Sequence, residues 1–178
     1  MSVSATPYSD LREKFSSDSD AARCEHRPME TICDAAGGMD GMRRLAHAWH
    51  ERVLADPVVS HAFSHGFHPD HTERLAAYWA EALGGPPAYS GAYGDEAQVV
   101  RMHSGNGDHH DMDDRAIACF DQALADVGLA GGSPLFQALH DYFAWATRGA
   151  MARYPASRRE VPADLGAIPR WDWTGPAA

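Results

Sequence analysis

The sequence lacks long apolar runs, and this argues against a membrane-spanning helix. No stretch approaches the run of about 20 apolar residues that is needed to cross a bilayer. The N-terminal segment has neither a basic flank nor an apolar run, so we expect no secretory signal. Cysteine is also scarce: Cys24, Cys33 and Cys119 are an odd number at no metal-ligand spacing. We therefore expect free thiols and a reducing, cytoplasmic compartment.

Basic residues are few as well. The 15 Lys and Arg residues are outnumbered by 25 Asp and Glu residues, which gives a formal net charge of −10. An acidic chain has no general attraction for phosphate backbones, so we expect no nucleic-acid partner. The sequence also lacks a glycine-rich nucleotide fingerprint, a Cys-x-x-Cys pair and a His-Glu-x-x-His motif. These absences argue against a built-in reductase module and against the common zinc sites.

Apolar residues and histidines are abundant. The chain has 178 residues, of which 44% are hydrophobic and 22% are charged, a composition that supports one folded domain with a real core. Its 11 histidines nearly equal its Lys and Arg residues together. Histidine is the commonest metal ligand and the usual acid or base near neutral pH. The central question is therefore which of these histidines perform chemistry.

The hydrophobic pattern predicts an all-α fold. Apolar residues recur at helical spacing, and no segment alternates with period two over a convincing length. Asp40 is a plausible N-cap, Asp56-Pro57 is a stop, and Ser133-Pro134 is a start signal. We expect helices over residues 39–55, 69–83, 96–103, 111–126 and 134–150.

Polar and proline-rich segments flank these helices. We expect a polar N-terminal arm over 1–34, with a short helix near 11–15, a helical domain over 35–152 and an irregular C-terminal extension over 153–178. Trp171 and Trp173 lie in that extension, and we expect them to dock on the core.

Four histidines close together suggest one kind of metal site. His61, His65, His68 and His71 fall within eleven residues, and the first two have i, i+4 spacing. A non-haem metalloenzyme that uses this cluster is one hypothesis. Pro69 interrupts any helix between His65 and His71, however, so one helix face cannot supply all four ligands.

Another arrangement involves His71 and His103. The break at Gly84-Gly85-Pro86-Pro87 allows the helices that carry these histidines to fold back on each other. Two imidazoles across an apolar slot suit a haem, in which one imidazole binds iron and the opposite side accepts a ligand. Paired core histidines also occur as structural residues, so the pattern alone leaves both interpretations open.

The stretch from Gly37 to Met151 resembles the truncated haemoglobins, which have a two-over-two helical sandwich. The matching features are a helix that ends at Asp56-Pro57, Phe63 soon after it, and the segment Ala-Tyr-Trp-Ala-Glu-Ala-Leu-Gly-Gly-Pro that ends at Pro86. A histidine follows in Val-Val-Arg-Met-His, which ends at His103. Asp-Gln-Ala-Leu, ending at Leu124, then closes the next helix. The order and spacing of these segments are closest to group II of the family.

The resemblance implies haem b as the cofactor and assigns its contacts residue by residue. His103 matches the proximal iron ligand, Phe63 matches the aromatic residue against the porphyrin face, and His71 and Leu75 match the distal pair. Arg74 and Arg101 match positions that often pair with the haem propionates. Arginines at those positions are chemically sensible, since a propionate pair adds negative charge to an acidic chain.

Two positions depart from the group II pattern. His50 replaces the usual tyrosine, and Ala116 replaces the usual tryptophan, so we expect atypical distal residues and a roomier pocket. A neutral imidazole of His50 or His71 can donate a hydrogen bond to a bound ligand, or bind iron itself. One of Trp49 and His50 must face the core, and the helix phase allows either. His50 can therefore instead be an exposed helix residue. We interpret His47, His68, His109, His110 and His140 as surface residues and Cys119 as a buried free thiol.

The implied function is binding of dioxygen, nitric oxide or carbon monoxide, with nitric-oxide or peroxide chemistry as a further activity. Any reductase would be a separate partner, and the chain would act as a monomer or a homodimer. Whether the protein is an enzyme stays open. Besides the non-haem metalloenzyme, the remaining alternative is a haem-free globin-fold protein that acts through interactions of its arm and tail.

Overall fold

The computed structural model describes residues 30–105, 110–129 and 131–177. Most of the predicted polar arm, its helix near 11–15, Cys24 and His109 lie outside these residues. Where the predicted arm ends, helix α1 (Ile32–Ala35) begins, and Thr31 caps it by accepting a hydrogen bond from the Asp34 amide at 3.0 Å. Ile32 and Cys33 are buried, so the core already includes the last residues that the sequence pattern assigns to the arm.

Helices follow the predicted order closely. The main elements are α2 (Gly38–Ala55), the 3-10 helix η1 (Val59–Phe63), α3 (His71–Ala82), α4 (Glu96–His103), α5 (His110–Asp126) and α6 (Pro134–Ala144). Ser133 caps α6 as predicted, with Pro134 in its first turn. The predicted N-cap Asp40 is wrong, because α2 begins after Gly37, whose φ of 94° suits glycine. Asp40 instead lies in the first turn of α2 and pairs with Arg43 at 2.8 Å.

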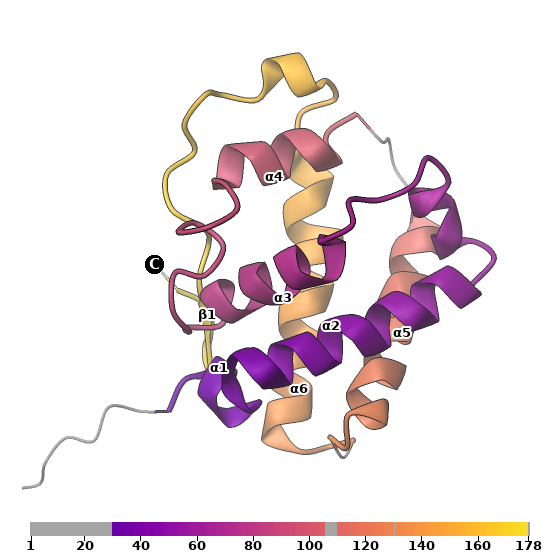
Figure 1. The fold of residues 1–178 in the computed structure, drawn as a ribbon, viewed down its shortest axis with the longest axis vertical. Helices are drawn as coiled ribbons and strands as arrows, with labels where there is room; N and C mark the ends of the chain where they lie inside the picture. The colour runs from indigo at the N-terminus through magenta and orange to yellow at the C-terminus, as the bar shows by residue number, and fades with distance from the viewer. Residues whose placement is uncertain (1–29, 106–109, 130, 178) are drawn as a thin grey trace, which may run out of the picture.

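The helices form the predicted two-over-two sandwich. In Figure 1, α2 and α3 lie across α5 and α6, and α2 packs most extensively against α3 and α5. Aromatic rings fill the space between the layers, where Phe120 and Phe143 stack with centroids 4.2 Å apart. The Trp79 ring meets both of them edge-on. The core therefore lies between the two helix pairs.

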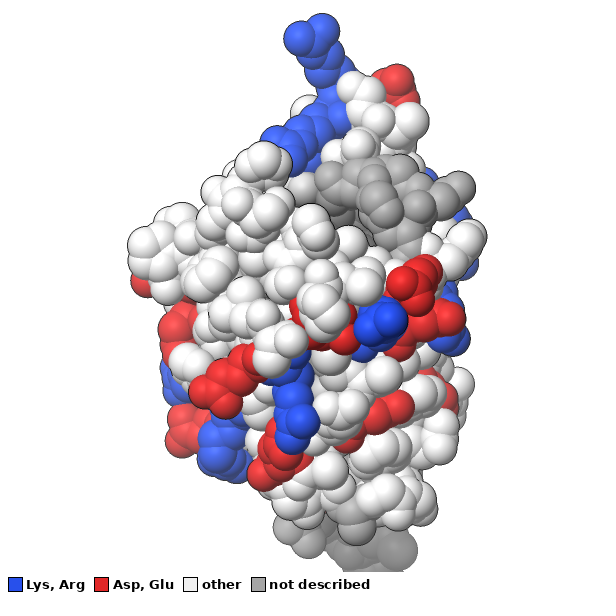
Figure 2. Space-filling view, turned by 90° about the vertical axis from the view of Figure 1, so that its right-hand side faces the viewer, with Lys and Arg blue, Asp and Glu red and all other residues white. Residues whose placement is uncertain are grey.

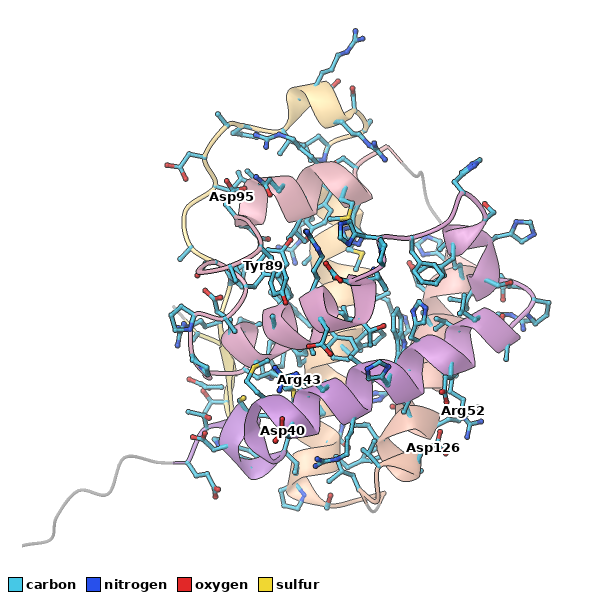
Figure 3. The ribbon with its side chains drawn as sticks, in the orientation of Figure 1. Asp40, Arg43, Arg52, Tyr89, Asp95 and Asp126 are labelled. Carbon is cyan, nitrogen blue, oxygen red and sulfur yellow. The ribbon has the colours of Figure 1, made fainter. Side chains whose placement is uncertain are left out.

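Charged side chains join these layers at the surface. Arg52 of α2 pairs with Asp126 of α5 at 2.7 Å, and Figure 3 shows the two side chains next to each other. The face shown in Figure 2 mixes acidic and basic side chains across its middle, so that face presents no continuous basic surface. Within the described part of the chain, no helix is both long enough and apolar enough to span a membrane.

The last helix departs from the prediction of a continuous helix over 134–150. The α-helix α6 ends at Ala144. The chain continues as a π-helix over Trp145–Ala150 and then as a 3-10 helix over Met151–Arg153. Thr147 lies within the π-helix, and its buried hydroxyl has no hydrogen-bond partner among the described residues. Helical spacing of apolar residues does not distinguish these helix types, because their turns differ by less than one residue.

The C-terminal extension packs on the bundle, which confirms the predicted docking of its tryptophans. It contains the 3-10 helix η4 (Arg158–Glu160) and the strand β1 (Trp171–Asp172), which pairs antiparallel with β2 (Gly175–Pro176). The Trp171 ring is 9% exposed and lies 5.3 Å from the Trp145 ring. Trp173 donates its indole N–H to the carbonyl of Glu30 at 2.7 Å. In Figure 1 the extension runs past α4 on its way to β1, so it lies against the helix that carries His103.

Candidate functional site

The connection between α3 and α4 reverses the chain, so the histidine-bearing start of α3 and end of α4 lie on the same side of the molecule (Figure 1). The buried carboxylate of Glu81 accepts hydrogen bonds from the amides of Tyr89 and Ser90 at 3.0 and 2.9 Å, which holds the loop after the Gly-Gly-Pro-Pro break. Asp95 caps α4 through the amide of Gln98, and Figure 3 shows Tyr89 and Asp95 along this return path. The chain therefore reverses direction before α4 begins, as the sequence predicts.

A partly buried hydrogen bond then joins α4 to α3. The Tyr78 hydroxyl donates to the carboxylate of Glu96 at 2.9 Å. Burial raises the pKa of Glu96, although this hydrogen bond opposes the shift. The bond joins the middle of α3 to the first turn of α4, so the ends of the two helices keep a defined separation.

His103, the predicted iron ligand, ends helix α4. Its Nδ1 lies 2.8 Å from the carbonyl oxygen of Val99, one turn earlier. A carbonyl only accepts, so Nδ1 carries the proton and Nε2 keeps a free lone pair. The side chain has an exposed face, yet surrounding protein atoms desolvate the ring and lower its pKa, against the opposing effect of the Val99 bond. A neutral imidazole with an open Nε2 is a suitable metal ligand.

His71 begins α3, and the protein holds it neutral. Burial, and to a smaller extent the neighbouring His50, His103 and His68, lower its pKa to about 4. Its Nε2 is buried without a hydrogen-bond partner among the described residues. His103 is among the groups that lower the pKa of His71, which favours the expectation that the two imidazoles approach a common space.

His50 lies inside the protein, and the alternative of an exposed helix residue is wrong. Its side chain is 8% exposed, and its ring centroid lies 5.2 Å from that of His71. Both ring nitrogens are buried and lack hydrogen-bond partners in the described structure. Burial also lowers the pKa of His50. Trp49 turns inward too, so both residues that the helix phase left open contribute to the interior.

Aromatic rings surround the two buried imidazoles. Phe63, at the end of η1, has its centroid 5.3 Å from His50 and 5.4 Å from His71. Phe67, which the sequence analysis did not single out, lies 4.6 Å from His50 and 5.9 Å from His71. Trp49 then links Phe63 to the core rings of Trp79 and Phe143. The histidine pair therefore lies where the aromatic core meets the surface.

Ala116 lies next to the same core, on α5. It is buried, and its carbonyl accepts the indole N–H of Trp49 at 3.2 Å. The indole of Trp49 therefore occupies space beside this small residue. Leu75, one turn after His71, is partly buried and packs on the core, as a residue on the inner face of α3 should.

The two predicted propionate arginines have different surroundings. The Arg74 guanidinium lies 5.2 Å from the centroid of the Tyr93 ring, and its buried Nε has no partner among the described residues. Arg101 donates from its guanidinium to the carbonyl of Pro162 at 2.8 Å, which ties α4 to the C-terminal extension. Arg74 therefore keeps an unused donor inside the protein, whereas Arg101 already has one acceptor.

The other histidines that the structure describes do not gather into a metal site. His61, His65 and His68 are exposed, and His68 Nδ1 accepts the amide N–H of Asp70 at 3.0 Å. Across the described ranges, no three His, Cys, Asp or Glu side chains gather in a way that could hold a metal ion. His47 and His110 are exposed as predicted, while His140 is partly buried against Asp121 at 2.7 Å. Cys119 is a buried free thiol, as expected.

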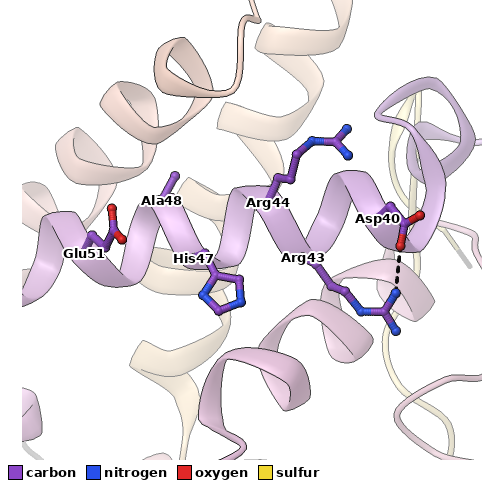
Figure 4. Close-up of a pocket in the computed structure, with 6 residues that line it drawn as sticks. All are labelled: Asp40, Arg43, Arg44, His47, Ala48 and Glu51. Carbon is purple, nitrogen blue, oxygen red and sulfur yellow. Dashed lines mark hydrogen bonds and ion pairs between the residues drawn. The ribbon is translucent and has the colours of Figure 1, made fainter.

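A shallow depression lies on the outer face of α2, away from the buried histidines. Figure 4 shows its lining, a mixture of acidic and basic side chains in which Arg43 pairs with Asp40. Arg43 also pairs with Glu73 of α3 at 3.0 Å. The lining of this depression is mostly charged, so the depression offers no apolar slot for a porphyrin.

A family model described as bacterial-like globin matches residues 31–143. This range covers more than half of the chain and includes every predicted site residue. The chain belongs to the bacterial-like globin family.

Solved structures with the same fold are truncated haemoglobins. A thermostable haemoglobin from Thermobifida fusca is 29% identical, with 70% of this chain and 98% of that chain covered and a TM-score of 0.57. A haemoglobin from Chloroflexus aurantiacus is 26% identical over 68% of this chain and 96% of its own, with a TM-score of 0.58. The group II truncated haemoglobin of Bacillus anthracis shares the fold at 21% identity over 72% and 99% of the two chains, with a TM-score of 0.61. Comparison with curated proteins gives no match.

Haem, which membership of the globin family implies, fits the residues present. A buried polar atom without a partner is unfavourable unless a ligand or water satisfies it. The described buried side-chain atoms without partners are both ring nitrogens of His50, Nε2 of His71, Nε of Arg74 and the hydroxyl of Thr147. Three of these four residues were selected from the sequence as haem contacts. This globin therefore keeps unused polar groups where the resemblance puts the haem.

Three residues near the site were not among the predicted haem contacts. Phe67 follows a glycine in a polar segment, so its spacing gives no helical or strand signal. Trp49 was considered only as an alternative to His50, and Tyr93 lies between the second and third predicted helices. Of the three, only Trp49 is next to a selected contact in the sequence, and an aromatic neighbour is too common a signal to be specific.

Proposed function

We propose that this globin binds haem b, with Nε2 of His103 as the proximal ligand of the iron, and that the haem takes up dioxygen or another diatomic ligand. The observation that carries this proposal is the hydrogen bond between His103 Nδ1 and the Val99 carbonyl. It fixes the tautomer that leaves Nε2 free, and a carbonyl partner also increases the basicity of the ligating nitrogen. Haem, when bound here, would supply an iron that can take up a diatomic ligand.

The other site residues hold the cofactor in this proposal. Phe63 and Leu75 supply apolar contacts to the porphyrin, and Ala116 borders the space next to Trp49. Arg74 offers its unused Nε to a propionate, and Arg101 contributes a second positive charge from α4. Charge-assisted hydrogen bonds from arginine suit carboxylates, and a chain with a net charge of −10 needs such local compensation.

His50 and His71 act on the ligand side. The lowered pKa values keep both imidazoles neutral at pH 7, so each has one N–H donor and one acceptor nitrogen. A donor aimed at a bound ligand stabilises partial negative charge on it, as the hydroxyl of a tyrosine would. A neutral imidazole can also move a proton between the two oxygens of a peroxide, which supports a peroxidase-type side activity. Either histidine can alternatively occupy the sixth position of the resting iron.

Nitric oxide and carbon monoxide are further ligands of such a site. Nitric-oxide oxidation or peroxide reduction requires electrons from a separate reductase, since the chain has no nucleotide-binding fingerprint. We also propose a cytoplasmic location and a monomeric or homodimeric state.

Haem titration tests this function. We expect the purified chain to bind ferric haem at 1:1 stoichiometry with an intense Soret absorption, and His103→Ala to abolish that spectrum or weaken the affinity by about 100-fold or more. His68→Ala is the matched control, because His68 is exposed and its loss should leave the spectrum unchanged. Addition of imidazole to His103→Ala should restore the lost ligand.

Other outcomes identify the alternatives. A normal spectrum from His103→Ala would contradict the assignment of the proximal ligand. Bound zinc or iron without porphyrin, measured by elemental analysis, would favour the non-haem metalloenzyme. A chain that takes up neither metal nor added haem would favour the interaction protein.

A further inference from the structure

Phe67 is a large apolar side chain at the protein surface. It is 47% exposed and lies in the segment between η1 and α3, after Gly66 and before Pro69. Single exposed apolar side chains are common in folded proteins, so the position of Phe67 matters through what its ring covers. The inner side of this ring has several partners.

Three rings of the proposed ligand side contact Phe67. Its centroid lies 4.6 Å from His50, with the planes at 79°, and 5.9 Å from Phe63 in a perpendicular arrangement. It lies 5.9 Å from His71 as well. Edge-to-face contacts of this kind are favourable, so they hold the Phe67 ring over both imidazoles.

Phe67 is also the outermost layer over His50. Of the three rings that contact His50, Phe63 and His71 are partly buried, whereas Phe67 is exposed. Both nitrogens of His50 are nevertheless buried. The Phe67 ring therefore separates solvent from the imidazoles on this side, and a ligand that arrives here must pass it.

We propose that Phe67 is a gate residue that admits diatomic ligands to the space beside His50 and His71 and excludes larger ones. This inference rests on the proposed haem function and deepens it, because it names the side chain that selects ligands by size. A small gas passes during minor displacements of the ring, whereas a longer ligand requires the ring to leave its three aromatic contacts.

Ligand association measured on the haem-loaded protein tests the gate. The variants are Phe67→Ala, which removes the ring, and Phe67→Leu, which keeps part of its volume. Leu54→Ala is the matched control, since Leu54 is 42% exposed and belongs to none of these ring contacts. Stopped-flow absorption would record the association rates of carbon monoxide and n-butyl isocyanide with the ferrous protein.

We expect selectivity to change more than ligand binding in general. Phe67→Ala should raise the isocyanide association rate by about tenfold and the carbon monoxide rate by less than about threefold. Phe67→Leu should give an intermediate isocyanide rate, and Leu54→Ala should match the wild type. An unchanged ratio of the two rates in Phe67→Ala would overturn the gate.

A second measurement does not depend on ligand binding at iron. Diethyl pyrocarbonate modifies accessible histidines, and mass spectrometry locates the modified peptides. Phe67→Ala should accelerate modification of His50 severalfold, whereas His47 on the exposed face of the same helix should react at the wild-type rate. Equal reactivity of His50 in both proteins would contradict the covering role of the ring.

The results that would overturn the gate differ from those that would overturn the proposed haem function. A loaded wild type with a normal carbon monoxide spectrum, together with unchanged rate ratios, would overturn the role of Phe67 alone. A wild type that binds no haem would overturn the proposed function, and the gate with it.

Discussion

Side chains with the same expected role in the sequence differ in their hydrogen-bond partners in the structure. Arg74 and Arg101 were selected from the sequence for the same task, yet Arg101 has the Pro162 carbonyl as a partner and Arg74 has a buried donor without one. The same distinction separates His68, whose Nδ1 is in use, from His71, whose Nε2 is free. A side chain with an unused buried donor is the better candidate for a ligand contact, because a ligand then satisfies a group that is otherwise unpaired.

This difference predicts unequal effects of two arginine substitutions on haem affinity. Arg74→Met keeps much of the side-chain volume and removes the unused donor, so the rate of haem loss should rise by about tenfold, as expected for one charge-assisted hydrogen bond. Arg101→Met should raise it by less than about threefold. Transfer of haem to an excess of a high-affinity scavenger protein would measure both rates. Equal rates for the two variants would contradict the inference.

At the scale of elements, α4 depends on packing from both sides. Tyr78 of α3 joins its first turn through Glu96, and the C-terminal extension joins its last turn through Arg101. A helix of eight residues has little stability in isolation, so these tertiary contacts determine where His103 lies. The extension therefore contributes to the proposed site although it carries none of its ligands.

Loss of a packing contact between the extension and the bundle should measurably lower stability. Trp171 is 9% exposed and packs on Trp145 and Tyr142, so Trp171→Ala should lower the free energy of unfolding by about 3 kcal/mol. Leu165→Ala is the control, since Leu165 is 40% exposed in the same extension and its loss should change stability by about 0.5 kcal/mol or less. Urea unfolding followed by circular dichroism would compare the variants. A Trp171→Ala protein as stable as the wild type would show that the extension does not stabilise the bundle.

At the scale of the whole molecule, buried neutral histidines connect the site to global stability. Folding lowers the pKa of His71 from its ordinary value of 6.5 to about 4, and it lowers the pKa of His50 as well. Between these values the unfolded chain binds a proton that the folded chain does not. Stability is therefore greatest above about pH 6.5 and falls as the pH decreases towards 4.

This linkage predicts acid-sensitive folding of the haem-free chain. From pH 7 to pH 4.5 the free energy of unfolding should decrease by up to about 3 kcal/mol on account of His71. His71→Leu should reduce this pH dependence, whereas a substitution of the exposed His47 should leave it unchanged. Urea titrations at a series of pH values would measure the slopes. A slope in His71→Leu equal to that of the wild type would contradict burial of a neutral imidazole.

Local sequence signals determined most of the elements of this protein. Ser133-Pro134 and Asp95 act within one helical turn, so the starts of α6 and α4 follow from residues adjacent in the chain. The spacing of apolar residues also determined which helix faces turn inward, because burial of apolar surface favours one face of each helix. The selection of His103, His71 and Phe63 further required the order of motifs along the whole domain.

Tertiary structure alone decided the features that depend on residues far apart in the chain. The helix phase allowed His50 to face either way, and packing against Phe63, Phe67 and His71 buried it. Thr147 stands in a π-helix that a period of apolar residues does not distinguish from an α-helix. Arg101 meets the extension across 61 residues of sequence. Local propensity determines which elements form, whereas the burial and the hydrogen-bond partners of each polar group depend on residues that are distant in the sequence.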